Sequence, residues 1–125
     1  MLDVEVIGDA LPEEEVRRAA MLAAATAGID DGHVAVAFVE EGEIEALNER
    51  HRGRPEPTDV LSFPVDEDDA PAGPRELGDV VISPEHTTDL LEAVVHGVLH
   101  LTGMDHERDA GEMLAVQAEL LTWMR

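Results

Sequence analysis

The sequence predicts a single α+β domain over residues 1–125, in which a small mixed β-sheet packs with helices. A chain of 125 residues suits one domain with one hydrophobic core, and its composition does not change abruptly along its length. Segments that alternate apolar and polar residues, as strands do, are interleaved with segments of helical spacing. Because this interleaving is irregular, it favours an α+β architecture over a doubly wound parallel sheet.

The first part of the chain predicts two strands and two helices. Residues 2–6 alternate apolar and acidic side chains, which is typical of a half-buried strand. Pro12 precedes three glutamates that suit the positive end of a helix, and Gly28 is expected to end that helix. Residues 34–38 alternate again and predict a strand, while residues 43–50 predict a short helix.

Two further strands are predicted in the middle of the chain. Residues 50–59 are rich in glycine and proline and are predicted to form a loop. The following segment, 60–65, contains branched and aromatic residues that favour a strand. Ser62 within it is interpreted as part of a core strand, with the wall of a functional cleft as the alternative. An acidic connection over 66–76 then leads to another predicted strand at 77–83.

Two helices are predicted in the last third of the chain. From Pro84, a broad apolar stripe typical of a buried helix runs to Gly103, which is expected to end the helix in a left-handed conformation. Residues 107–124 carry methionine, leucine and valine side chains at helical spacing and predict an amphipathic helix. We expect the first of these two helices to be the central helix of the fold.

Composition excludes several classes of site. The chain has no cysteine, so disulfides and thiolate zinc sites are excluded and histidine must do any metal work. Its 29 acidic residues face 8 basic ones, which gives a formal net charge of −21. A field of this sign repels phosphate backbones, so composition alone argues against nucleic-acid binding, and any polyanionic substrate would need a local basic site. A very soluble or salt-adapted surface is the simpler interpretation of the charge.

Membrane association is not expected. No segment approaches the roughly 20 apolar residues that a membrane span needs. The first residues also lack the basic and apolar regions of a secretory signal. These two features predict a cytoplasmic protein.

The segment HGVLHLTGMDH, residues 96–106, carries the strongest candidate site. His96 and His100 are four residues apart on a predicted helix, so their imidazoles leave the same face one turn apart. A turn at Gly103 would allow His106 to reach the same point. Three neutral imidazoles match a catalytic zinc site, which leaves a fourth position to water. We predict one Zn²⁺ per chain, the alternative being ordinary polar residues on a buried helix.

The same spacing raises a rival hypothesis, a zinc peptidase or amidase. The metzincin proteases have the pattern HExxHxxGxxH, with a glutamate general base directly after the first ligand. Gly97 occupies that position here, and it has no side chain with which to move a proton. Gly97 therefore counts against a peptidase.

Three segments together resemble the YbeY family of bacterial endoribonucleases: HGVLHLTGMDH at 96–106, RGRPEPTDVLSFP at 52–64 and LGDVVIS at 77–83. They occur in the order that the family has. The resemblance implies a metal-dependent endoribonuclease that cuts single-stranded RNA, in maturation of small-subunit ribosomal RNA and in ribosome quality control. It also implies an α+β fold and a catalytic role for Arg52. The zinc ligands that it implies are His96, His100 and His106.

The chemistry of its side chain also supports a catalytic role for Arg52. A planar guanidinium is always charged, holds a phosphate with two hydrogen bonds and stabilises negative charge that develops in a transition state. The alternative is a surface ion pair among many acidic neighbours. Arg54 is a weaker candidate for positioning phosphate. The remaining histidines have no ligand-like spacing and are predicted not to bind metal: His33, His51 and His86.

Three hypotheses about function follow from these residues. The leading one is hydrolysis of phosphodiester bonds in single-stranded RNA, with ribosomal RNA as the substrate. The second is the peptidase or amidase, because an acidic surface would not deter a peptide substrate. The third is a non-enzymatic ribosome-assembly factor with a structural zinc, whose acidic surface contacts small-subunit ribosomal proteins. Because only three ligands are visible, the site keeps an open position, which favours catalysis.

Overall fold

Four strands, four α-helices and one 3₁₀ turn make up the part of the chain that the structure describes. It is a computed structural model that describes residues 2–53, 59–64, 76–104 and 109–125, except for the side chain of Arg52. No helix within these ranges is long and apolar enough to cross a membrane. In chain order the elements are β1 (Leu2–Ile7), α1 (Glu13–Ala25), β2 (Gly32–Phe38), α2 (Glu41–Arg52), β3 (Val60–Pro64), β4 (Glu76–Ile82), η1 (Pro84–His86), α3 (Leu90–Leu101) and α4 (Glu112–Met124).

The four strands form one mixed sheet in the order β1-β2-β4-β3. Strand β2 pairs in parallel with both β1 and β4, whereas β3 pairs antiparallel with β4 at the edge. The register places Val36 beside Val80 and Leu61 beside Val81. The small mixed sheet and the α+β class predicted from the sequence are therefore confirmed.

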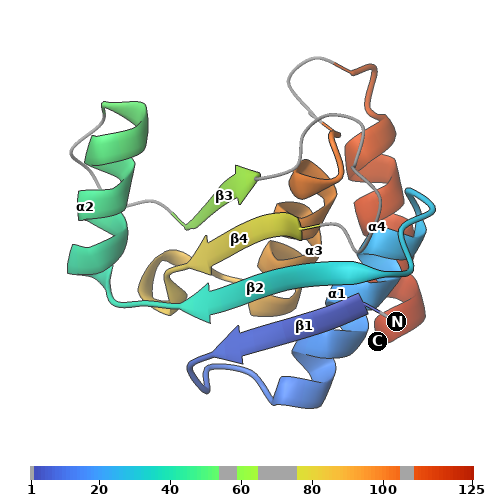
Figure 1. Cartoon of the computed structure of the whole chain (residues 1–125), viewed down its shortest axis with the longest axis horizontal. Helices are drawn as coiled ribbons and strands as arrows, with labels where there is room; N and C mark the ends of the chain where they lie inside the picture. Colours follow the sequence, from blue (N-terminus) through green and yellow to red (C-terminus); the bar gives the residue numbers. More distant parts are fainter. Residues whose placement is uncertain (1, 54–58, 65–75, 105–108) are drawn as a thin grey trace.

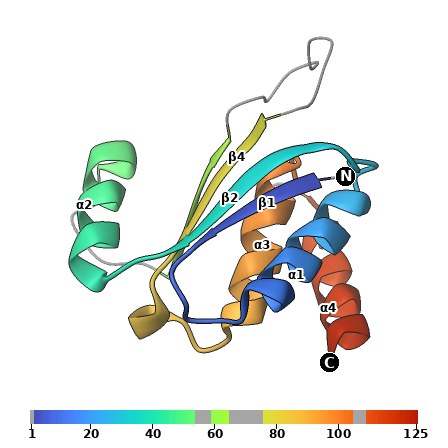
Figure 2. The same ribbon diagram turned by 60° about the horizontal axis from the view of Figure 1, so that its bottom comes forward.

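Three helices cover one face of this sheet (Figures 1 and 2). Helix α1 packs on β1, and α3 packs on β3 and β4. Helix α4 packs on α1 and α3. This layering makes α3 the central helix, since it contacts the sheet on one side and two helices on the others.

The main core lies between the sheet and these helices. Every second residue of a strand points to the same face of the sheet. Val34 and Val36, which point into this core, have no exposed surface, as expected for a strand with a covered face. Helix α3 contributes a broad apolar surface whose fully buried members are Val94, Val95, Val98 and Leu99. Burial on this scale stabilises the helix by roughly 1.5–3 kcal/mol for each large side chain.

Helix α2 belongs to a second, smaller core. Ile44 is fully buried against Leu61 and Val81, whose side chains leave the sheet on the face that α3 does not cover. Figure 2 shows α2 on the opposite side of the sheet from α1, α3 and α4. The two cores share the edge strand β3 and its neighbour β4.

Two predicted helix boundaries are wrong. The stripe that begins at Pro84 was predicted as one helix, but Pro84–His86 form a separate 3₁₀ turn and α3 begins only at Leu90. The reason is a cap, because the Asp89 side chain accepts a hydrogen bond from the backbone N–H of Glu92 at 3.2 Å. The last helix begins at Glu112, later than the predicted segment, after a left-handed Gly111.

Candidate metal centre

Helix α3 carries the two described histidines of the predicted site. Its start is fixed by the Asp89 cap, and its end by Thr102 and by Gly103, whose φ of 103° favours glycine. The predicted stop at Gly103 is therefore confirmed. Between these ends the helix is held by its apolar face, so the half-buried His96 and His100 sit on a rigid element.

His96 and His100 lie side by side, as their spacing predicts. Their ring centroids are 4.7 Å apart and the rings meet edge to face. Two neighbouring imidazoles on one turn of helix are a suitable half of a zinc site, because neutral nitrogen ligands are what zinc prefers in the absence of thiolates. The described part of the donor set thus fits the metal that the sequence predicts.

The third predicted ligand, His106, lies outside the described residues. Among those that are described, no three histidine, aspartate or glutamate side chains are grouped so that they could hold a metal ion. Met104, whose backbone N–H bonds to the Leu99 carbonyl at 3.2 Å, is the last described residue before the segment that contains His106. The three-histidine site therefore stays a prediction.

The structure adds Gln117, a residue that the sequence analysis missed. Its Oε1 atom lies 2.8 Å from Nδ1 of His96. Gln117 belongs to α4 and is only 8% exposed. A signal was available, because Gln117 lies on the buried face of that helix, four residues after Met113 and three before Leu120. A polar residue within an apolar stripe indicates a specific partner.

A cavity of about 510 Å³ opens beside His96. It is bounded by β3, η1, α3 and α4, and three carboxylates line it, those of Asp59, Asp89 and Glu92. Leu114, which is 47% exposed, contributes an apolar wall next to Gln117. The cavity therefore offers hydrogen-bond acceptors and apolar surface, and none of its described lining residues is a lysine or an arginine.

Gly97 faces the sheet. A Cβ atom at this position would lie 2.4 Å from Cγ1 of Val80, much closer than two carbon atoms approach. Ser62 of β3 also donates a hydrogen bond to the Gly97 carbonyl at 3.1 Å. The absence of a side chain therefore lets α3 approach β3 and β4 closely, and the half-buried Ser62 joins the edge strand β3 to α3.

This packing yields a prediction for position 97. Gly97→Ala is expected to destabilise the fold by about 1–3 kcal/mol, because the stiff Val80 side chain cannot move aside freely. Urea unfolding measures the loss of stability. In a protein that already carries Val80→Ala, the change Gly97→Ala is expected to cost less stability than in the wild type. Gly97→Glu is expected to create no peptidase, since its side chain starts toward Val80. Equal stability of Gly97→Ala, or peptide cleavage by Gly97→Glu, would contradict this packing.

Arg52 is the last residue of α2 and not part of a loop, which corrects the prediction for residues 50–59. The helix continues to this point because its stop signal comes only at Gly53. Gly53 has a φ of 70°, and its backbone N–H donates a hydrogen bond to the Glu49 carbonyl at 3.0 Å. The side chain of Arg52, like all of Arg54, lies outside what the structure describes. Helix α2, which ends at Arg52, and helix α3, which carries the two described histidines, lie on opposite faces of the sheet (Figures 1 and 2).

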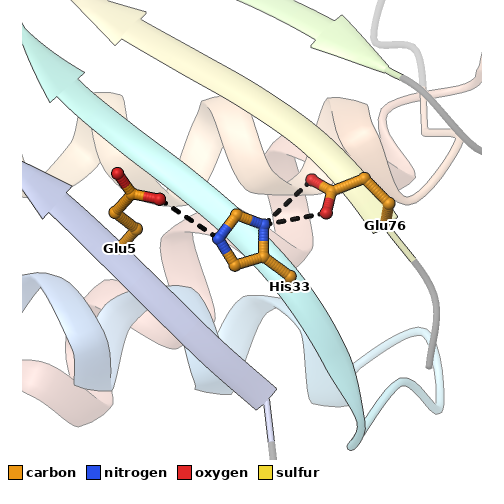
Figure 3. Close-up of polar contacts among 3 residues, drawn as sticks. All are labelled: Glu5, His33 and Glu76. Carbon is orange, nitrogen blue, oxygen red and sulfur yellow. Dashed lines mark hydrogen bonds and ion pairs between the residues drawn. The ribbon is translucent and has the colours of Figure 1, made fainter.

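The other three histidines have local partners. His51 packs its ring on Phe63 with the centroids 4.7 Å apart, and His86 lies 3.4 Å from a Glu41 oxygen. His33 lies between carboxylates of the two neighbouring strands (Figure 3). These histidines were predicted not to be metal ligands, and each is occupied by a structural contact.

His33 forms a polar bridge across the sheet. Its Nδ1 is 2.8 Å from a Glu76 oxygen and its Nε2 is 3.3 Å from a Glu5 oxygen. The hydrogen bond with Glu76 raises the pKa of His33 above its ordinary value; burial opposes the shift, and Glu5 and Asp3 add to it. Because carboxylates only accept, a protonated ring satisfies both contacts at once.

Protonated His33 is expected to stabilise the fold at acidic pH. Its folded pKa is raised above the unfolded value of about 6.5, so the contribution is complete below that pH and is lost as the pH rises through the folded pKa. The His33 side chain is 33% exposed, so we expect a contribution of at most about 1 kcal/mol. The measurement is the unfolding free energy of the wild type minus that of His33→Gln, followed across neutral pH. A difference that does not change with pH would contradict the bridge.

Comparison with known proteins places this chain in one family. The family described as Endoribonuclease YbeY matches residues 6–125. Proteins named Endoribonuclease YbeY include one from Acidothermus cellulolyticus, 45% identical over 74% of this chain and 70% of that protein. Another, from Macrococcus caseolyticus, is 37% identical over 97% of this chain and 94% of that protein. The solution structure of a Thermotoga maritima protein, 28% identical, aligns with a TM-score of 0.60 over 97% of this chain and 88% of that chain. The chain therefore belongs to the YbeY family of endoribonucleases.

Proposed function

We propose that this chain is a zinc-dependent endoribonuclease that cuts single-stranded RNA in the cytoplasm. Its substrate is ribosomal RNA, in maturation of the small subunit and in ribosome quality control. The observation that carries the proposal is the His96–His100 pair, of which His96 lines a cavity, in a chain matched over residues 6–125 to an endoribonuclease family.

His96, His100 and His106 are the residues that would hold one Zn²⁺. When bound, zinc supplies a Lewis acid that lowers the pKa of water and so makes a nucleophile available at neutral pH. The contribution of the protein is orientation, because α3 fixes the two described imidazoles relative to the cavity. The helix is packed on both sides, so this orientation is expected to persist when substrate binds.

Arg52 is assigned to the substrate phosphate. The net charge of −21 repels an RNA backbone, so the positive charge must be local. A guanidinium binds phosphate oxygens in pairs and stabilises charge that grows on them during cleavage.

The lining of the cavity supports an unpaired base as its occupant. The carboxylates of Asp59 and Glu92 accept hydrogen bonds, and three of the four RNA bases, adenine, guanine and cytosine, carry an exocyclic amino donor. The walls formed by Leu114 and Val60 are apolar and suit the face of a base. A phosphate would be repelled by the same carboxylates. Bases that are accessible in this way occur in single strands and not inside a duplex.

Acidic surface charge also supports a role for small-subunit ribosomal proteins as partners. A non-enzymatic assembly factor would use the same surface, so catalysis must be tested directly. The peptidase hypothesis is weakened further, because position 97 faces Val80 and not the cavity.

One assay separates the three functions. Zinc-loaded protein is incubated with a labelled single-stranded RNA, with the same RNA in a duplex and with a mixture of peptides, each with and without a chelator. We expect only the single strand to be cut, the chelator to stop cleavage and added zinc to restore it. Cleavage of peptides would establish the rival hydrolase. Bound zinc without cleavage of any substrate would establish the assembly factor.

A further inference from the structure

The amide of Gln117 is a buried polar group in the described core. It is 8% exposed on the packed face of α4, among apolar residues. Burying an amide without a hydrogen bond is unfavourable, so a polar side chain at such a position needs a partner. The partner is His96, whose Nδ1 lies 2.8 Å from Gln117 Oε1.

This contact decides which tautomer His96 adopts. Oε1 of an amide accepts hydrogen bonds and cannot donate them, so Nδ1 of His96 must carry the proton. In a neutral imidazole the other nitrogen, Nε2, then holds the lone pair. A metal binds only the nitrogen with the lone pair, so the Gln117 contact leaves Nε2 ready to act as a ligand.

Helix α4 is anchored at both ends, which keeps Gln117 in place. At its start the Asp109 carboxylate accepts from the N–H groups of Gly111 and Met113 at 2.9 and 3.0 Å. At its end Arg125 pairs with Asp89, the residue that caps α3. The guanidinium holds the pKa of Asp89 below its usual value, and the Glu92 N–H contributes. The two helices that carry Gln117 and His96 are thus joined by a second contact near the α3 cap.

We infer that Gln117 is the residue that orients His96 for metal binding, by fixing the ring and its Nδ1–H tautomer. The inference rests on the proposed function, because it assumes that His96 is a ligand. Gln117 also lines the cavity, but in this role it acts through His96 and not by direct contact with the metal. Loss of an outer contact of this kind lowers metal affinity by about 10- to 100-fold in other proteins.

The first test needs no variant. Nitrogen-15 NMR of the metal-free wild type distinguishes the two tautomers of His96, because protonated and unprotonated ring nitrogens have different chemical shifts. We expect the Nδ1–H form for His96, although free imidazole side chains in water favour Nε2–H. An Nε2–H ring at His96 would overturn the inference.

The second test measures zinc affinity by competition with a chelator. Gln117→Leu keeps the size of the side chain but removes the acceptor, and is expected to bind zinc about 10- to 100-fold more weakly. Gln117→Glu restores an acceptor and is expected to recover most of the affinity. Val116→Ala, one residue earlier on α4, loosens packing without removing a hydrogen bond and is expected to leave affinity unchanged.

The outcomes separate this inference from the proposed function. If the wild type binds zinc and Gln117→Leu binds it equally well with an unchanged His96 tautomer, only the role of Gln117 is overturned. If Val116→Ala loses as much affinity as Gln117→Leu, packing of α4 and not the hydrogen bond is responsible. If the wild type itself binds no zinc, the metal site fails and with it the proposed function.

Discussion

Each of the variants His96→Ala, His100→Ala and His106→Ala is expected to lose stoichiometric zinc and, with it, cleavage of RNA. Three protein ligands are the minimum for a catalytic zinc site, so removing any one leaves two. Stability is expected to fall as well, because a metal that binds only the folded state adds its binding free energy to that state. Metal content by elemental analysis and thermal unfolding with and without chelator measure the two effects.

His86→Ala is the matched control for these variants. His86 lines the same cavity as His96 but lies on the η1 turn and contacts Glu41. We expect it to retain about one zinc per chain. Unchanged zinc content in all three ligand variants, or equal loss in His86→Ala, would contradict the assignment of ligands.

Arg52→Ala is expected to keep its zinc and its fold but to cut RNA at least about 10²-fold more slowly. The magnitude is that of removing one electrostatic contact with charge that develops in a transition state. Arg52→Lys is expected to recover little, because an ammonium is a point charge and does not reproduce paired hydrogen bonds to a phosphate. Single-turnover cleavage of labelled RNA at saturating protein measures the chemical step.

Arg50→Ala controls for loss of charge. Arg50 is exposed on the same helix, two residues before Arg52, so its removal changes the net charge by the same amount. We expect its cleavage rate to stay within a few-fold of wild type. If Arg52 instead forms a surface ion pair, both of its variants should cleave normally and lose at most about 1 kcal/mol of stability. Normal cleavage by zinc-loaded Arg52→Ala would remove this residue from the mechanism.

The sequence predicted the architecture well where one face of an element is buried. Alternation in strands such as Leu2–Ile7 and the continuous apolar surface of Leu90–Leu101 both arise from burial against one core. Boundaries were predicted less well, because they depend on caps. The side chain of Asp89 fixes the start of α3, and the left-handed Gly53 ends α2 directly after Arg52. Neither residue changes the hydrophobic pattern.

The polar contacts of the site were harder to predict because they join distant parts of the chain. His96 and Gln117 are 21 residues apart and meet because α3 and α4 pack together. His33 and Glu76 are 43 residues apart and meet because β2 pairs with β4. In contrast, the His96–His100 pair follows from helix geometry alone and was predicted correctly.

RNA cleavage is expected to depend on one metal ion held by the three histidines. The most direct measurement is a zinc titration of metal-free protein, in which cleavage of a labelled single-stranded RNA is followed beside His100→Ala. We predict that activity rises in proportion to zinc and reaches its plateau at about one ion per chain, while His100→Ala stays inactive throughout. Full cleavage by the metal-free protein, or equal activation of His100→Ala, would contradict the claim.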